Sequence, residues 1–201
     1  MDSYSKTIVI NSPAGSGGIF CRELIRGNIE SEIVWPRHRA MGFQKDDINI
    51  CLIRDPYDVI ASAVEVGFEE VPEEVKDFYN NDEDTMIYDQ MIWHLMKYFR
   101  FLNLAQRMDY ITPVSFKFLT EEPDKFLESI AEKFELNFKA NRLSVEDVKT
   151  NIRNEKEHMT RVPRDKTDFR KKIDEVVRNY EPIKLAHEEY VRVINSINDK
   201  I

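Results

Sequence analysis

The run Ile-Asn-Ile-Cys-Leu-Ile at residues 48–53 constrains the fold more than any other feature of the sequence. A nearly continuous apolar run of this length is typical of a strand that is covered on both faces in a parallel sheet. Arg54, Asp55 and Pro56 follow it directly. Since Asp is suited to cap a helix and Pro to occupy its first turn, residues 48–66 predict a buried strand that turns directly into a helix.

Strand and helix signals alternate along the rest of the chain. A β-branched run at 7–10 and a weaker strand signal at 110–116 flank the central run; Pro113 in the second of these belongs at an edge or a bulge. Helical periodicity covers residues 19–26, with Gly27 as a stop, then 84–108 and 126–134, and two helices after residue 167 that break near Pro182. This alternation predicts one α/β domain spanning residues 1–201, a three-layer sandwich with a central, mostly parallel sheet flanked by helices.

Composition narrows the class of protein. The net charge of −8 argues against general binding to nucleic acid. Cys21 and Cys51 lie in apolar stretches without the spacing of a zinc site, which is typical of buried thiols in a reducing compartment. No leader or membrane-spanning pattern is evident in the sequence. We therefore expect a soluble cytoplasmic protein without a membrane or nucleic-acid partner.

The turn after the first strand is rich in glycine, with the residues Ala14, Gly15, Ser16, Gly17 and Gly18. Backbone N–H groups of such a turn, at a helix N-terminus, suit a phosphate or a sulfate. A plain glycine-rich connection is the alternative. The turn is not a Walker A loop, because that motif requires a Lys and none occurs between Lys6 and Lys45.

Arg54 emerges at the carboxyl end of the buried strand, where open α/β sheets bind ligands, and Ser62 follows eight positions later. This pattern resembles the signature of the PAPS-dependent sulfotransferases, an Arg-Asn/Asp-Pro-x-Asp turn followed by a Ser. The resemblance implies a P-loop NTPase-like fold of the sulfotransferase type. It also implies that Arg54 and Ser62 hold the 3′-phosphate of 3′-phosphoadenosine 5′-phosphosulfate (PAPS), and that residues 14–18 hold the 5′-phosphosulfate.

A third stretch, residues 114–134, resembles the family's next strand, its Asp-Pro turn and its amphipathic helix. Phe116 falls where the family often has a Tyr near the adenine, so the resemblance implies an adenine contact there. An ordinary core position is the alternative. The three motifs occur in the family's order and cover about the first 140 residues.

The first loop departs from the family, which usually has a Lys or Arg directly after the Pro, whereas Ala14 and Gly15 follow Pro13 here. Arg37, His38 and Arg39 are the candidate replacements, because sulfuryl transfer needs a base for the acceptor proton and cations for the leaving group. His38 is the expected base, with Arg37 or Arg39 as the cation; a solvated basic loop is the alternative.

The other histidines carry weaker signals. His94 lies beside the buried face of a helix and is expected in the core, while His158 and His187 lie in polar surroundings without a recognisable partner. A late basic loop contains Arg161 and Arg164, which resemble in place and charge the family's loop over the 3′-phosphate. A plain solvated loop is the alternative for these two arginines.

The sequence thus predicts in-line transfer of a sulfuryl group from PAPS, without a metal, to a hydroxyl or amine acceptor of unknown size. Two alternatives remain open: a P-loop-related nucleotide kinase or phosphotransferase, and a non-catalytic nucleotide-binding protein on a sulfotransferase fold. The sequence identifies neither the acceptor nor the oligomeric state.

Overall fold

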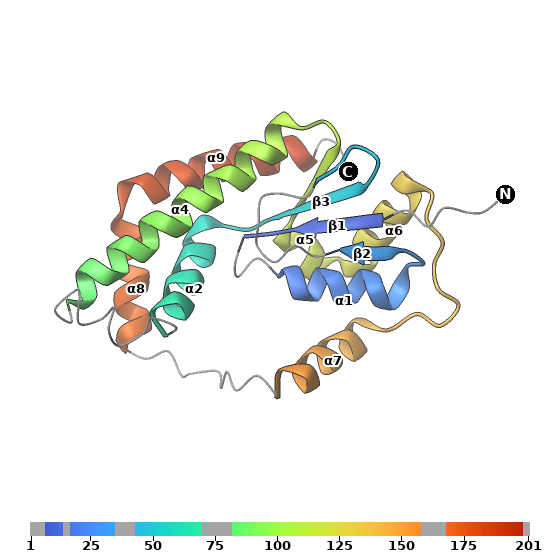
Figure 1. The fold of residues 1–201 in the computed structure, drawn as a ribbon, viewed down its shortest axis with the longest axis horizontal. Coiled ribbons are helices and arrows are strands. Elements are labelled where there is room, and N and C mark those ends of the chain that lie inside the picture. Colours follow the sequence, from blue (N-terminus) through green and yellow to red (C-terminus); the bar gives the residue numbers. More distant parts are fainter. Residues whose placement is uncertain (1–6, 14–16, 35–42, 70–81, 158–167, 199–201) are drawn as a thin grey trace.

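The computed structural model describes residues 7–13, 17–34, 43–69, 82–157 and 168–198. In this part of the chain four parallel strands form one sheet, in the order β2-β1-β3-β4, with helices on both faces (Figure 1). The strands are β1 (Thr7–Asn11), β2 (Glu32–Val34), β3 (Ile48–Ile53) and β4 (Ile111–Ser115). The predicted α/β class with a parallel sheet is therefore confirmed.

The strand β3 divides two hydrophobic cores, because its six residues are all buried and alternate between the faces of the sheet. Ile48, Ile50 and Leu52 pack in one core, and Cys51 and Ile53 pack in the other. The apolar run at 48–53 therefore has the two-sided burial that its composition predicts.

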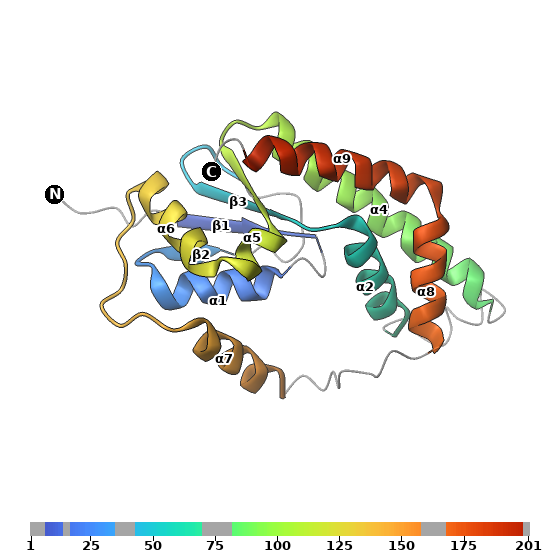
Figure 2. The same ribbon diagram turned by 180° about the vertical axis from the view of Figure 1, so that it is seen from behind.

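Helices form the two outer layers (Figures 1 and 2). One face of the sheet is covered by α1 (Gly18–Asn28), α5 (Phe116–Glu121), α6 (Pro123–Phe134) and α7 (Val145–Glu157). The other is covered by α2 (Pro56–Glu69), α4 (Glu83–Arg107), α8 (Asp168–Asn179) and α9 (Glu181–Asn198). The connection from β1 to β2 runs one way across the sheet, and the connection from β3 to β4 runs the other way. Because both crossovers are expected to be right-handed, α1 and α2 lie on opposite faces.

The long helix agrees closely with its sequence pattern. All six positions of the predicted stripe on α4 are buried, namely Ile87, Met91, Leu95, Tyr98, Leu102 and Ala105. Asp82 caps this helix by accepting hydrogen bonds from the backbone N–H groups of Asp84 and Thr85. The predicted break near Pro182 is also confirmed, since α8 ends at Asn179 and α9 begins at Glu181.

One boundary prediction was wrong. Gly27 does not stop the first helix; it lies inside α1, which continues to Asn28. A Cβ atom at Gly27 would lie 2.8 Å from Cδ1 of Leu143, so the small residue allows close packing of the segment before α7. The periodicity also gave no sign of β2, α5 and α7, which are short or largely polar.

Three further predictions concern single residues. Pro113 lies in β4, at an edge of the described sheet, as expected. Cys21 and Cys51 are buried free thiols, and burial raises the pKa of both. Among the helices that the structure describes, none has the length and apolar character needed to cross a bilayer.

Candidate functional site

The turn between β3 and α2 forms as the sequence predicts. Asp55 caps α2, its Oδ1 accepting a hydrogen bond of 2.9 Å from the backbone N–H of Tyr57. Pro56 is the first helical residue, and the first helical hydrogen bond runs from the Val59 N–H to the Asp55 carbonyl at 3.1 Å. The backbone on either side of Arg54 is therefore fixed by the end of a buried strand and by a capped helix.

Three contacts also hold Arg54 itself. Its carbonyl accepts a 2.6 Å hydrogen bond from the hydroxyl of Tyr98, which is buried in α4. Its guanidinium Nη2 lies 3.2 Å from Oδ2 of Asp58, one turn into α2. Its Cζ lies 4.5 Å from the ring centroid of Phe116, within cation–π range. The side chain remains 28% exposed, so its charge is oriented by protein contacts and still accessible from solvent.

Gly17 lies against the same aromatic ring. Its φ of 78° is in the left-handed region, and its carbonyl accepts a 3.0 Å hydrogen bond from the Cys21 N–H at the start of α1. A Cβ atom added at Gly17 would overlap the Phe116 ring, being 2.7 Å from Cδ2 and closer still to Cε2. Only glycine both adopts this backbone conformation readily and leaves room for the close approach of the ring.

Gly17, Arg54 and Phe116 thus form one cluster, which we call the strand-end cluster. They follow the carboxyl ends of β1, β3 and β4, which are neighbours in the sheet. After β1 the chain crosses to β2 on one side, whereas β3 lies on the other side of β1, so the chain changes direction between β1 and β3. Open α/β sheets bind ligands at such a switch point.

The electrostatics of the edge favour an anion near α1. The helix begins at Gly18 with no acidic residue in its first turn, and the preceding Gly17 offers no side chain to cap its N–H groups. The first turn of α2 instead contains Asp58, which is already paired with Arg54. A phosphate bound to Arg54 would have to displace the Asp58 carboxylate or share the guanidinium with it.

Ser62 lies on the same side of α2 as Asp58, because residues four apart share a helix face. Arg54 precedes α2, and its guanidinium contacts Asp58, one turn before Ser62. Ser62 is half-buried. Ser62 therefore lies one helical turn beyond the residue that pairs with Arg54.

The structure also corrects the interpretation of His187. Its Nδ1 lies 3.2 Å from Oδ2 of Asp55, in ion-pair range, although the bond angles are not those of a hydrogen bond. The ring centroid is 5.1 Å from that of Tyr57 and 6.0 Å from that of Tyr190. His187 therefore has a partner at the turn beside Arg54, which the sequence did not indicate because the two residues are far apart in the chain.

Tyr190 extends this second group of residues on α9. Burial raises the pKa of its phenol, and the carboxylates of Asp55 and Asp58 raise it further. Its hydroxyl is consequently a neutral hydrogen-bond donor over the ordinary pH range. We call His187 and Tyr190 the α9 pair; with Asp55 they border the strand-end cluster.

Other predicted site residues lie outside the described part of the chain. These are Ala14, Gly15, Ser16, Arg37, His38, Arg39, Arg161 and Arg164. Among the described ones, Gly17, Arg54 and Phe116 come together, Gly18 begins α1, and Ser62 lies on α2. His94, expected in the core, is only half-buried, with its ring edge-on to Trp93.

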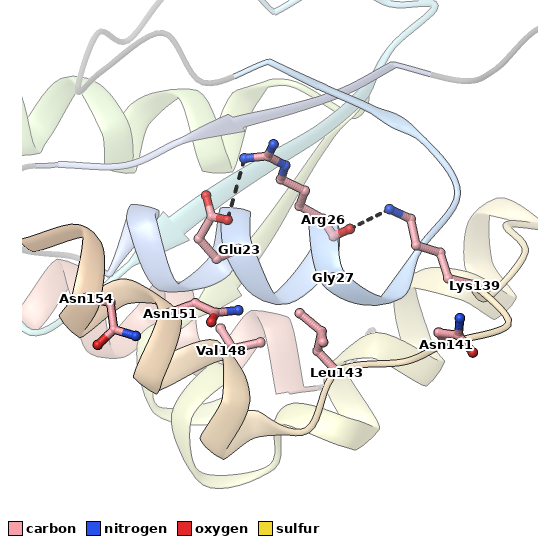
Figure 3. A pocket seen from close by; sticks show the side chains of 9 residues that line it. All are labelled: Glu23, Arg26, Gly27, Lys139, Asn141, Leu143, Val148, Asn151 and Asn154. Carbon is pink, nitrogen blue, oxygen red and sulfur yellow. Dashed lines mark hydrogen bonds and ion pairs between the residues drawn. The ribbon is translucent and has the colours of Figure 1, made fainter.

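A separate groove of about 570 Å³ lies between α1 and α7 (Figure 3). Asn151 and Asn154 of α7 line one side, and the Lys139 ammonium donates a 2.8 Å hydrogen bond to the Arg26 carbonyl at one end. Its α1 residues, Glu23, Arg26 and Gly27, belong to the half of the helix remote from Gly17. The groove is therefore distinct from the strand-end cluster.

Comparison with known proteins gives no relative: no family model matches the sequence, and no curated protein or solved structure matches it significantly.

Proposed function

We propose that the chain binds PAPS at the strand-end cluster and transfers its sulfuryl group to a hydroxyl or amine acceptor. The observation that carries this proposal is the position of Arg54, which is held beside Phe116 and Gly17 where the chain changes direction between β1 and β3. Three motifs that are distant in the sequence thus meet at the edge where parallel sheets bind nucleotides. On this proposal the fold is the P-loop-like sandwich of the sulfotransferases.

Each residue takes a role from its chemistry. Arg54 and Ser62 bind the 3′-phosphate, since a guanidinium and a hydroxyl both donate hydrogen bonds to an anion. Residues 14–18 and the N-terminus of α1 bind the 5′-phosphosulfate. The Phe116 ring contacts the adenine, and Arg161 and Arg164 of the late basic loop bind the 3′-phosphate.

The transfer itself needs a base and a cation. The acceptor oxygen or nitrogen attacks sulfur, the bond from sulfur to the 5′-phosphate oxygen breaks, and 3′-phosphoadenosine 5′-phosphate leaves with the electron pair. The acceptor proton passes to a base, for which His38 is the first candidate, and Arg37 or Arg39 stabilises the charge on the leaving group. His187 is a second candidate, because it lies at the turn beside Arg54 and faces a carboxylate.

Titration calorimetry with 3′-phosphoadenosine 5′-phosphate, ADP and magnesium-ATP tests the nucleotide class. We expect the bisphosphate to bind most tightly and, at a hundred times its Kd, to stabilise the fold by about 2.7 kcal/mol. Preference for magnesium-ATP would instead support a phosphotransferase and end the PAPS proposal.

Transfer of labelled sulfate to a panel of hydroxyl and amine acceptors tests catalysis. His38→Ala and His187→Gln separate the two candidate bases: loss of the base lowers kcat and leaves the affinity for the bisphosphate unchanged. A mutant with full activity removes that histidine from the mechanism.

A non-catalytic nucleotide-binding protein is a second candidate function, favoured by one observation. The family's basic residue after the first-loop Pro is missing, because Ala14 follows Pro13. Tight binding of the bisphosphate, together with no transfer to any acceptor in the panel, supports this candidate.

A further inference from the structure

Beside its buried stripe, the long helix α4 has a strip of exposed apolar residues. Tyr88, Ile92, Met96 and Phe99 are 37% to 58% exposed, although they are large and hydrophobic. At 100° per residue they fall within about 80° of the helix circumference and extend along about 16 Å of its length. Together with the adjoining buried stripe they make an apolar arc wider than the ~100° that is usual for a surface helix, so more of α4 is apolar than its own core requires.

Two more exposed side chains extend this strip. Trp93 of α4 is 53% exposed, and Leu185 of the neighbouring helix α9 is 55% exposed. Leu185 and Phe99 line one groove of about 580 Å³ between the two helices. We call these six residues the α4 surface: Tyr88, Ile92, Trp93, Met96, Phe99 and Leu185. Exposed apolar patches of several hundred Å² mark interaction sites.

Two charged residues beside the α4 surface, Asp89 and Arg100, have opposite signs and lie toward its two ends. Asp89 and Arg100 lie within about 20° of each other around the helix, on the side of the α4 surface. Along the axis, Asp89 lies about 7.5 Å on one side of residue 94 and Arg100 about 9 Å on the other. Suppose that a second α4 packs antiparallel against this surface, related by a two-fold axis at the level of residue 94 along the helix. Each Asp89 would then lie opposite an Arg100 of the other copy.

The apolar pattern is compatible with the same axis. Tyr88 and Phe99 lie at similar distances on either side of residue 94, and so do Ile92 and Met96. A two-fold interface requires a patch that is complementary to itself, so that each residue of one copy meets its counterpart from the other end of the patch. Tyr88 of one copy would then face the groove beside Phe99 and Leu185 of the other.

The available area is sufficient for a dimer. Each of the six side chains has roughly 200 Å² of surface, so the exposed half amounts to on the order of 600 Å² per copy. Pairing two copies would bury on the order of 1,200 Å², the lower bound for stable interfaces. A membrane surface is a poorer occupant, because a chain of net charge −8 is repelled by anionic lipid.

We propose that two copies of this chain pair through the α4 surface, with the two α4 helices antiparallel and Asp89 of each copy opposite Arg100 of the other. This inference is independent of the proposed function. It uses neither the strand-end cluster nor the α9 pair.

Sedimentation equilibrium over a concentration series tests the dimer. We expect a mass twice the 23.8 kDa of the chain, which falls to the monomer on dilution. Asp89→Arg and Arg100→Asp each place like charges opposite one another, and each is expected to raise the dissociation constant at least tenfold. The double variant Asp89→Arg/Arg100→Asp restores the attraction and is expected to recover most of the affinity.

A mixture of the two single variants gives the sharpest result, because every charged contact in the mixed dimer is then attractive. We expect mixed dimers to form more tightly than dimers of either variant alone. Val191→Glu is the matched control, since Val191 is an exposed apolar residue of α9 about 120° away from Leu185. It should leave the dimer unchanged, whereas Met96→Glu should abolish it.

Three results would overturn the proposal. The first is a wild-type chain that stays monomeric at about 100 µM. The second is a dimer indifferent to Met96→Glu and to both charge changes. The third is a monomer that co-floats with vesicles of phosphatidylcholine and phosphatidylserine, which assigns the α4 surface to a bilayer.

Discussion

The guanidinium carbon of Arg54 lies 4.5 Å above the ring centroid of Phe116, and the same ring lies against the backbone of Gly17. These residues are brought together by the carboxyl ends of three neighbouring parallel strands. The charge of Arg54 is held in one direction by the ring and by Asp58, so an anion meets an oriented donor.

Removing this donor should weaken binding of nucleotides with a 3′-phosphate. We expect Arg54→Ala to lower the affinity for 3′-phosphoadenosine 5′-phosphate by a factor of roughly 10 to 100, as for loss of a charge-assisted hydrogen bond. Affinity for adenosine 5′-phosphosulfate, which has no 3′-phosphate, should change little. Calorimetry measures both, with Arg192→Ala, an exposed arginine of α9, as control. Equal losses for the two nucleotides would contradict a 3′-phosphate contact.

Gly17→Ala should destabilise the fold, because the new Cβ overlaps Phe116 and the φ of 78° is unfavourable for Ala. We expect a loss of about 1–3 kcal/mol in urea unfolding. Phe116→Leu in the same chain should recover part of this loss by relieving the overlap, and the rest should remain as backbone strain. Gly67→Ala is the control, because its Cβ would crowd only the movable end of Gln90 and would lie in ordinary contact, at 3.7 Å, with Nε2 of His94.

Asp55 has two separable roles, as a helix cap and as the partner of His187. Asp55→Ala should lower the free energy of unfolding by about 1 kcal/mol through loss of the cap. Asp55→Asn should lower it by less, because Asn is also a good capping residue. Urea unfolding of the two variants compares these roles, because Asp55→Ala removes both the cap and the charge, whereas Asp55→Asn removes only the charge. Equal losses of unfolding free energy in the two variants would show that the charge facing His187 matters more than the cap.

Glu135 has a positive φ of 53° at the end of α6, where glycine is usual. The Leu136 N–H donates to the Ala131 carbonyl at 2.8 Å, as in a helix that ends with a left-handed residue. We expect Glu135→Gly to stabilise the fold by up to about 1 kcal/mol, since it relieves the side chain's steric strain. Glu132→Gly, inside the same helix, should be destabilising by about 1 kcal/mol, and thermal unfolding of both variants provides the comparison.

Burial raises the pKa of the Cys51 thiol from 9.0 to about 12, so the native state keeps a proton that the unfolded state releases. The stability from this protonated thiol is complete below pH 9 and is lost as the pH rises toward 12. The free-energy gap between wild type and Cys51→Ala should therefore narrow between pH 9 and pH 10.5, by up to about 1.4 kcal/mol per pH unit. If urea unfolding gave a free-energy difference between wild type and Cys51→Ala that did not change with pH, the thiol would have to ionise in the folded protein as readily as in the unfolded one.

The sequence predicted the elements whose local signals are strong. The apolar run at 48–53, the Asp55-Pro56 helix start and the buried stripe of α4 all agree with the structure. Gly27 was misread as a helix stop because its small size serves packing against Leu143, a contact that no local pattern encodes. The helix α7 was missed because its surface is largely polar and it packs by few residues, among them the buried Val148.

The sequence by itself determined those strands and helices whose local signals are strong, because burial periodicity, helix caps and proline geometry act between residues close in the chain. It also singled out Arg54, Gly17 and Phe116 as separate positions. Only the tertiary structure decided that Gly17 and Arg54 both lie against Phe116, that His187 faces Asp55, and that apolar residues beside the buried stripe of α4 are exposed to solvent. The physical reason is that strand order and helix docking, which bring distant residues within a few ångströms, depend on how the whole chain buries its apolar surface.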